Sequence, residues 1–574
     1  MARSGRNPVG VVEMPRFSPR VASQARQPWA DRWNPVGIPI CVGIVVLGAF
    51  CASAQLPAFP GAQGFGGYAI GGRFGDVYHV TNLSSDEKLP GSLAYGLATV
   101  PEPGRTIVFD VSGYIPINGR LTLNRGKVTI AGQTAPGDGI GLKGGTFLIS
   151  ASDVVIRHVR FRNGRSADTL NLDSRATNCI LDHCDVLLGK DENLSSFRRP
   201  ADRFTFQWSI NAWGMETHSA GGLWDFHRAT CHHSLWAHNH TRNPKARPAL
   251  LDWVNNVTFD YDIGFILGDS ASPADWKANI LGSWFICPPG NLRPVALEKA
   301  RLQATNNQPN FSLHIADSHM DANGDGRLNI SKSGYAIASG NFRTNAGIFP
   351  NGMPSMQTDD ALTAYKKLVS AVGPLRLDAD ALPALRDELD SILISNLVNQ
   401  VRHHVHNPVE THASNDGYGE LKSGPASKDS DGDGMPDFWE TAVGLNPKMD
   451  DQTNLVPAGV FVSEGYTALE EYLHFRAAPH LVFASGGTNV APNSGPVLEE
   501  DLRYYTAGFN KAPIRYSFAK VMGGKVVLRD SSIASFTRTN GLSGRASFEF
   551  TVTDGDNSSW TQEFLILITV TIHR

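Results

Sequence analysis

Residues 154–161 read VVIRHVRF, and similar segments recur before and after them along the chain. They are VTIAGQ from Val128, CILDHCDV from Cys179, FTFQWSI from Phe204, ATCHHSLW from Ala229 and VTFDYDIG from Val257. The starts of these segments differ by 26, 25, 25, 25 and 28 residues, a period narrow enough to mark an internal repeat. Each segment alternates apolar and polar residues, which is the period of a β-strand. The repeat therefore predicts stacked strands rather than helices.

A repeat of this length with short strands predicts a solenoid, in which each coil buries its inward side chains only against its neighbours. The expected fold is all-β, a right-handed parallel β-helix over residues 55–345. In this register Cys179 and Cys231 face inward, and we interpret them as small core residues. His158, His183 and His233 share the fifth position of their segments, outside the apolar set, and we expect them to form a partly exposed ladder.

The composition agrees with a β-rich protein of several domains. The chain has 574 residues, with 57 glycines, 34 prolines and only 18% charged residues, so turns are expected to outnumber long helices. The formal net charge of −4 excludes a global basic field that would hold nucleic acid or an anionic membrane. An anionic ligand must therefore be met by local cations.

The N-terminus predicts export. The apolar run IPICVGIVVLGAFC at residues 38–51 precedes Ala52 and Ala54, which form the small-x-small pattern of a cleavage site. The run is too short for a comfortable membrane span. We expect a signal peptide with a long n-region over residues 1–54 and a secreted, monomeric mature chain, either extracellular or associated with the periplasm or cell surface. Its four remaining cysteines do not make a disulfide scaffold.

Residues 231–247, CHHSLWAHNHTRNPKAR, concentrate histidines and cations on a predicted strand and turn. A zinc site would require tightly spaced Cys or His pairs, or HExxH on a helix, and neither is present here. A nucleic-acid interface would require interleaved aromatic residues and a wider basic surface. The third interpretation is a catalytic base with a clamp for an acidic substrate.

The third interpretation is supported by a family resemblance. HHS followed by the hexad RNPKAR, which begins ten residues after His232, resembles the HHN…RxPxxR signature of the pectate lyase family. This polysaccharide lyase family 1-like group belongs to the pectin lyase superfamily of right-handed β-helices. Further similar segments begin at Ala58, Thr106, Thr129 and Val254, so the resemblance spans roughly residues 58–345. It implies an enzyme that cleaves polygalacturonate, the anionic polysaccharide of plant cell walls.

The resemblance implies a role for each cation of the hexad. The proton-abstracting base falls on Arg242, and Arg247, Lys245 and His218 are implied to bind substrate. Ala220 stands where some relatives have a substrate-contacting lysine. In β-elimination the C5 proton beside a carboxylate is removed and the O4 sugar leaves. A cation 4 Å from that carboxylate contributes about 4 kcal/mol at an effective dielectric near 20, or roughly three pKa units. Because arginine seldom deprotonates, we expect activity to rise well above pH 7.

The resemblance also implies Ca²⁺ as a cofactor, bound by Asp168, Asp191 and Glu192. Where the family has DxDxxxxD, this chain has SADTLNLD, in which Asp168 matches the second acid and Ser166 replaces the first. Ca²⁺ prefers six to eight oxygen ligands. The missing oxygens would come from water or from the polyuronate, so affinity without substrate should be weak.

A second calcium site is predicted independently of the β-helix. The stretch DSDGDGMPDFWE from residue 429 matches the twelve-residue calcium loop and resembles bacterial thrombospondin-type-3-like repeats. Its ligand positions are occupied by Asp429, Asp431, Asp433, Asp437 and Glu440. The similar stretch DANGDGRLNISK from Asp321 has Lys332 at the last position, and we interpret it as a turn.

The remaining segments complete the expected domain order. Residues 346–425 place apolar residues at helical spacing and predict a small helical extension. Residues 426–478 hold the calcium loop and a helical segment. Residues 479–574 alternate apolar and polar residues and predict an antiparallel β-sandwich, similar to cadherin-like or Ig-like modules of secreted enzymes.

Two other functions compete with a lyase. A noncatalytic β-helix that binds or adheres to polysaccharide could keep the hexad as a carboxylate clamp. A β-helix glycoside hydrolase would need two carboxylates flanking the bond, and no paired acids stand beside the hexad. Unsaturated product distinguishes the lyase from both.

Overall fold

The computed structural model describes residues 55–165, 167–247, 249–268, 276–291, 295–298, 311–339, 342–344, 347, 356–378, 385–457, 460–484, 497–539 and 542–569. The expected signal peptide at residues 1–54 and Ser166 lie outside these ranges. The described residues from Gln55 onward belong to one compact unit. None of the helices in the described ranges is long and apolar enough to cross a membrane.

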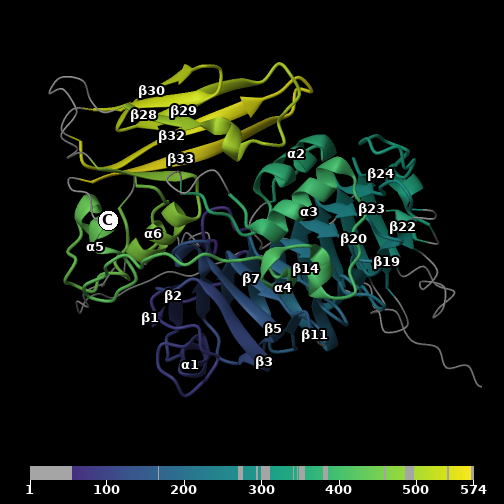
Figure 1. Ribbon diagram of the computed structural model, residues 1–574, viewed down its shortest axis with the longest axis horizontal. Helices are drawn as coiled ribbons and strands as arrows, with labels where there is room; N and C mark the ends of the chain where they lie inside the picture. The colour runs from purple at the N-terminus through teal and green to yellow at the C-terminus, as the bar shows by residue number, and fades with distance from the viewer. Residues whose placement is uncertain are drawn as a thin grey trace, which may run out of the picture. The chain divides into compact units, whose positions relative to one another are not determined.

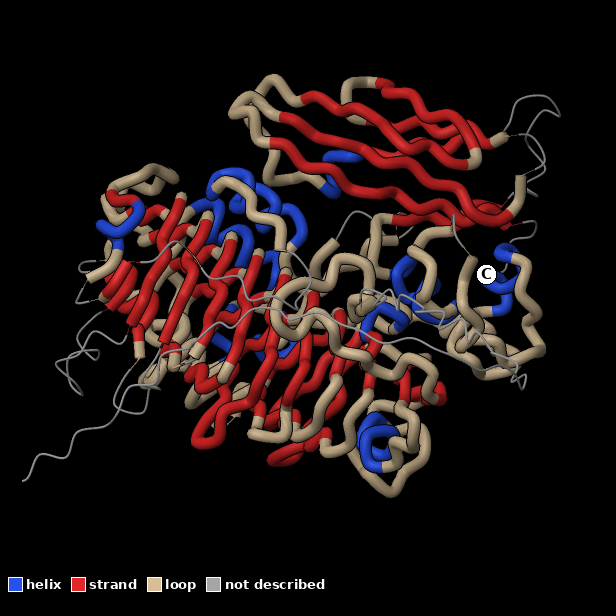
Figure 2. Tube along the Cα trace, turned by 180° about the vertical axis from the view of Figure 1, so that it is seen from behind, coloured by secondary structure: helices blue, strands red, loops and turns tan. Residues whose placement is uncertain are grey.

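The repeat folds as a right-handed parallel β-helix, as predicted, and Figures 1 and 2 show its strands stacked side by side. One face contains β1 (Asp76–Val80), β2 (Arg105–Phe109), β4 (Val128–Ala131), β6 (Val154–Arg157), β9 (Thr177–Asp182), β14 (Arg228–His232), β17 (Leu250–Val254), β20 (Trp276–Leu281), β23 (Phe311–Ala316) and β26 (Arg343–Thr344). A second face contains β7 (Val159–Arg162), β10 (Asp185–Leu187), β12 (Ile210–Ala212), β15 (Leu235–Ala237), β18 (Val257–Phe259), β21 (Trp284–Ile286) and β24 (His319–Asp321).

A third face completes each coil. It contains β8 (Leu170–Leu172), β13 (Leu223–Phe226), β16 (Lys245–Ala246), β19 (Ile263–Leu267) and β22 (Val295–Glu298). The paired long strands β3 (Gly113–Leu123) and β5 (Ile140–Ile149) turn the corner between the second face and this one, because β5 pairs with β7 at its start and with β8 at its end. The long strand β11 (Leu194–Gln207) turns the corner between this face and the first, because it pairs with β8 and β13 on one and with β9 and β14 on the other. The short β25 (Lys332–Ser333) pairs antiparallel with β24.

The strand register confirms five of the six repeated segments and corrects the sixth. The partners in successive coils are Val128, Val154, Cys179, Phe204 and Ala229. Ala229 then pairs with Leu251, whereas Val257 lies on the second face and pairs with Leu235. The prediction was wrong because the strands of one coil share the same alternation, so the pattern did not distinguish their faces.

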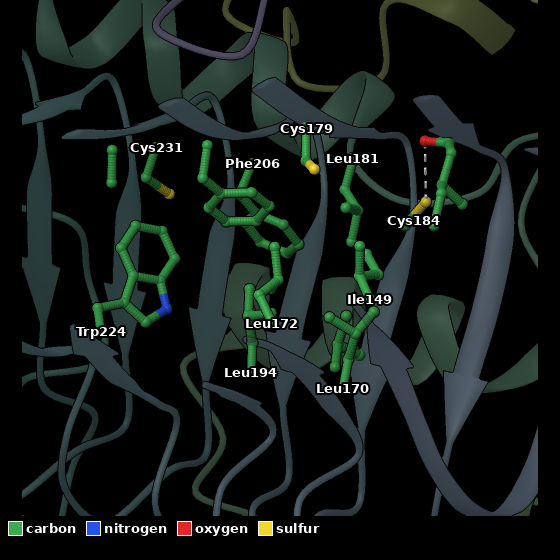
Figure 3. Packing of buried hydrophobic residues seen from close by; sticks show 14 of the residues in the cluster. Ile149, Leu170, Leu172, Cys179, Leu181, Cys184, Leu194, Phe206, Trp224 and Cys231 are labelled. Carbon is green, nitrogen blue, oxygen red and sulfur yellow. Dashed lines mark hydrogen bonds between the residues drawn. The ribbon is translucent and has the colours of Figure 1, made fainter. Parts of the chain in front are cut away.

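The interior of the β-helix is packed with aliphatic, aromatic and thiol side chains that project from facing strands, as Figure 3 shows. Cys179 and Cys231 are 1% and 0% exposed and are free thiols. Both lie in this core with Leu181, Phe206 and Trp224. The prediction that these cysteines act as small core residues is confirmed.

Four consecutive coils turn sharply after the first-face strand, at a residue with left-handed backbone. His158, His183, Trp208 and His233 have φ angles of 54°, 50°, 50° and 49°. Their rings stack at centroid distances of 5.0, 5.9 and 4.4 Å. The expected histidine ladder exists but is more buried than predicted, because the helical extension covers it: the backbone N–H of Leu375 donates to Nδ1 of His158 at 3.4 Å.

The helical extension contains the two predicted main helices, α2 (Ala361–Ala371) and α3 (Glu388–Asn399). The side chains of Asp360 and Asp387 cap their N-termini. Both helices bury apolar residues in one cluster with β10, β12, β15 and β18 of the second face. Shorter helices are α1 (Leu93–Ala98) and α4 (Ser414–Gly417).

The C-terminal part begins with α5 (Asp437–Val443) and α6 (Ala468–Arg476) and ends in two sheets. One sheet orders β27 (His480–Ala484), β33 (Ser559–Thr569), β32 (Gly544–Thr553) and β29 (Arg515–Met522), and the other β28 (Val497–Asp501), β31 (Ile533–Arg538) and β30 (Gly524–Arg529). Phe536, Phe548 and Phe564 belong to the core that the sheets share. The expected antiparallel sandwich has one exception, since β27 runs parallel to β33.

Candidate active site

Consecutive coils bring the predicted base beside the predicted acids. Glu192 pairs in parallel with Ala220, and Ala220 pairs with Thr241 in the next coil. Arg242 follows directly and its Nη1 donates to Oε1 of Glu192. The Arg242 side chain is 24% exposed and that of Glu192 is 6% exposed. The guanidinium is therefore paired with a carboxylate but remains accessible from solvent.

Two further acids and a histidine adjoin this pair. Oδ1 of Asp168 accepts a hydrogen bond from the backbone N–H of Glu192 at 2.9 Å. Nε2 of His218 lies 3.2 Å from Oδ1 of Asp191 and 3.8 Å from Oε1 of Glu192. The structure thus gathers five predicted site residues into one group, called here the acid–arginine cluster: Asp168, Asp191, Glu192, His218 and Arg242.

The acid–arginine cluster crowds three carboxyl groups around one guanidinium. Burial, together with the nearby Asp168 carboxylate, raises the pKa of Glu192 to about 8, and burial also raises the pKa of Asp168. Ligand atoms of Asp191, Glu192 and His218 lie within 4.8 Å of one another. Three carboxylates are the hard oxygen donors that Ca²⁺ prefers, and they would supply part of its six to eight ligands. The residues present therefore fit the predicted cation.

A network of buried asparagines supports the turn that carries Arg242, and the sequence reasoning missed it. Nδ2 of Asn243 donates to the backbone O of Asn239 at 3.0 Å, and Nδ2 of Asn239 donates to Oδ1 of Asn243 at 2.9 Å. Nδ2 of Asn193 donates to Asn211 and Asn239, each at 3.0 Å. Buried amides satisfied in this way fix one backbone arrangement. The available signal was the recurrence of asparagine in successive coils.

The other two cations of the hexad lie in different surroundings. Lys245 is 7% exposed, in β16 between Leu223 and Ile266 of neighbouring coils. The side chain of Arg247 is 11% exposed, and its Nη1 lies 3.8 Å from Oδ2 of Asp225. Asp225 was not predicted, and it offsets part of the positive charge of Arg247.

The calcium loop gathers four of its five predicted ligands and adds one. Oxygens of Asp429, Asp431 and Asp433 lie within 4.8 Å of one another, and a second such group joins Asp433 to Glu440 and Asp451. These five residues are called here the loop cage. The fifth predicted ligand, Asp437, accepts hydrogen bonds from the backbone N–H of Ser430 at 2.8 Å and from Nζ of Lys428 at 2.5 Å.

The stretch from Asp321 is closed by an amide. Nδ2 of Asn323 donates to Oδ1 of Asn329 at 2.7 Å, and Nδ2 of Asn329 donates to Oδ2 of Asp325 at 3.2 Å. These hydrogen bonds agree with its interpretation as a turn.

The fold and the acid–arginine cluster together define a parallel β-helix with an accessible arginine set against a group of carboxylates. No family model matches the chain. The probable pectate lyase C of Aspergillus flavus is 33% identical over 431 residues, which cover 73% of this chain and 93% of that protein. That of Aspergillus fumigatus is 34% identical over 444 residues, covering 74% and 96%.

The chain therefore belongs to the pectate lyase family, which confirms the resemblance of the hexad. Among solved structures, a pectate lyase from Bacillus sp. N165 in complex with trigalacturonate aligns with a TM-score of 0.39 and 14% identity. The alignment covers 55% of this chain and 98% of that one.

Proposed function

We propose that this chain is a secreted lyase that cleaves polygalacturonate by β-elimination, with Arg242 as the base and Ca²⁺ as cofactor. One observation carries the proposal: Arg242 is accessible and lies directly against the acids predicted to hold the cation. Membership of the pectate lyase family supports the same reaction.

In the proposed reaction the C5–H bond of a galacturonate residue breaks and its proton passes to the guanidine of Arg242. The electron pair forms the C4–C5 double bond, and the C4–O4 bond breaks with its electron pair on O4. O4 takes a proton from solvent water as the chain leaves. Arg247 and Lys245 would hold the uronate carboxylate and lower the cost of charge at C5. Nη1 of Arg242 donates to Oε1 of Glu192, so substrate would have to draw the guanidine away from this carboxylate. Bound Ca²⁺ would offset the charge of the acids and of the substrate.

The proposed partner is the anionic polysaccharide itself. One observation supports the alternative, a noncatalytic β-helix that binds polysaccharide. The guanidinium of Arg242, the proposed base, is already hydrogen-bonded to Glu192. Export through residues 1–54 and a monomeric state belong to the proposal. N-terminal sequencing of secreted material and light scattering test these two points.

The test follows the product of mature protein incubated with polygalacturonate and calcium. Ultraviolet absorbance from the unsaturated sugar is expected with wild type and absent with Arg242→Lys. Arg228→Lys is a matched control, because Arg228 is also partly exposed and paired with a carboxylate, that of Asp202; it should retain activity. Reducing ends without absorbance would overturn the proposal in favour of a hydrolase. Binding without any product would overturn it in favour of an adhesin.

A further inference from the structure

The loop cage contains buried carboxylate oxygens that nothing in the described part of the chain satisfies. Glu440 is 0% exposed and neither of its oxygens has a hydrogen-bond partner there. Asp451 is 6% exposed, and its Oδ1 also has no hydrogen-bond partner in the described ranges. An ionised carboxylate buried without a partner is strongly unfavourable. A positive charge among these side chains would remove that cost.

Two groups of close carboxylate oxygens meet at Asp433. Asp433 belongs to both groups of close oxygens, so it joins Asp429 and Asp431 to Glu440 and Asp451. Its own Oδ2 also accepts the backbone N–H of Asp451 at 3.2 Å, which ties that residue to the loop. Oδ2 of Asp429 accepts the backbone N–H of Gly434, whose φ of 88° suits glycine at the sharp turn.

The donor set selects the kind of ion. All five side chains offer carboxylate oxygens, and the two groups of ligand atoms contain neither cysteine nor histidine. Hard oxygen donors with several negative charges favour Ca²⁺ over zinc or copper. Asp451 lies outside the twelve-residue loop, so the motif alone does not identify it.

We propose that the loop cage binds Ca²⁺ through Asp429, Asp431, Asp433, Glu440 and Asp451, and that this ion stabilises the junction between the β-helix and the C-terminal sheets. The site shares no residue with the acid–arginine cluster. Its function is structural and is separate from the proposed cleavage of polygalacturonate.

Contacts around the cage connect it to the β-helix. Nε2 of His79, in β1, lies 3.4 Å from Oδ2 of Asp429, and Nδ1 of the same ring lies 3.0 Å from Asp110. On the other side Trp439, next to Glu440, is 0% exposed and packs on Phe475 with ring centroids 4.9 Å apart. An ion that positions Glu440 therefore also positions Trp439.

The apolar core around Trp439 reaches both the β-helix and the C-terminal sheets. It includes Ala131 of β4 and Leu565 and Leu567 of β33. Arg545 of β32 donates to the backbone O of Val443, the last residue of α5, at 3.3 Å. Repulsion among the acids in the absence of an ion would strain this junction.

The experiment measures calcium binding by calorimetry and thermal unfolding with EDTA or calcium, on the full mature chain. Calcium should raise Tm by several degrees in wild type. Glu440→Gln and Asp451→Asn should lose most of this rise and weaken one calcium site by roughly tenfold or more. Because repulsion is relieved, Glu440→Gln in EDTA should be at least as stable as wild type in EDTA. The calcium requirement for cleavage should not change in either variant.

Asp437→Asn is the matched control, since Asp437 belongs to the same loop but not to the cage, and it should retain the calcium-dependent rise. Wild-type calcium affinity in Asp451→Asn would overturn the assignment of Asp451. A full rise in Tm in Glu440→Gln would overturn the site, whether or not the protein cleaves polygalacturonate.

Discussion

Two carboxylate clusters of this chain differ in what balances their charge. In the acid–arginine cluster the guanidinium of Arg242 lies against Glu192 and is accessible from solvent. In the loop cage Glu440 is fully buried, and neither oxygen has a partner in the described ranges. An accessible internal cation suits a group that exchanges a proton with substrate, whereas a buried cage favours a permanently bound ion. The accessible arginine thus marks the proposed catalytic site, and the buried, unpaired acids mark the proposed structural ion site.

The largest effect is expected from removing the internal cation. Arg242→Ala should lower kcat on polygalacturonate by about 10²–10⁴-fold, since a positioned base contributes that much. In the presence of calcium Tm should change little, because the ion proposed beside Glu192 would replace the lost partner of this buried carboxylate. Glu440→Gln should leave kcat unchanged and lower Tm only in the presence of calcium. Initial rates and thermal unfolding of both variants check this, and equal losses of rate would remove the distinction between the sites.

A smaller effect is expected from weakening the proposed catalytic cation site. Asp168→Asn removes one charge but keeps an oxygen that can accept the N–H of Glu192. The calcium concentration for half-maximal activity should rise by about 10–100-fold. The calcium-dependent gain in Tm should remain. An unchanged requirement in an activity titration would show that Asp168 is not a ligand.

Disrupting the asparagine network should lower both the stability of the protein and its catalytic rate. Asn239→Ala leaves buried amides without partners and should cost about 1–3 kcal/mol of unfolding free energy. It should also lower kcat with little change in KM, because the turn of Arg242 loses its support. Asn256→Ala is the control: its amide bonds Cys231 and Ser234 in the same β-helix. That variant should be equally destabilised while its folded fraction keeps full kcat.

The smallest effect concerns acid stability of the histidine ladder. Burial, with the nearby charges of His183 and Arg157, holds the pKa of His158 well below its usual value of 6.5. The unfolded chain therefore binds a proton that the folded chain does not, and stability falls as pH drops below about 6.5. Each such histidine contributes up to about 1.4 kcal/mol per pH unit. His158→Asn, which tolerates the same backbone, should flatten this slope in denaturant unfolding between pH 7 and 4.5. An identical slope would contradict the assignment.

The β-helix and most of the acid–arginine cluster could be predicted, because the repeat fixes which residues stack and the hexad places Arg242 within it. The place of the next strand in the first face could not be predicted. The segments at Leu251 and Val257 have the same alternation of apolar and polar residues, and only strand pairing shows that Leu251 follows Ala229 while Val257 follows Leu235. Asp451 and the asparagine network were missed because they depend on how distant segments meet. The same holds for the hydrogen bonds that hold Asp437 away from the cage.

The most direct test of the two-site account is a crystal structure of Arg242→Lys with calcium and a trigalacturonate, using anomalous scattering to locate the ions. The account predicts one calcium among Asp433, Glu440 and Asp451 and another at Asp168, Asp191 and Glu192 beside a uronate carboxylate, with C5 facing residue 242. Sugar bound away from residue 242, or no ion in the loop cage, would contradict it.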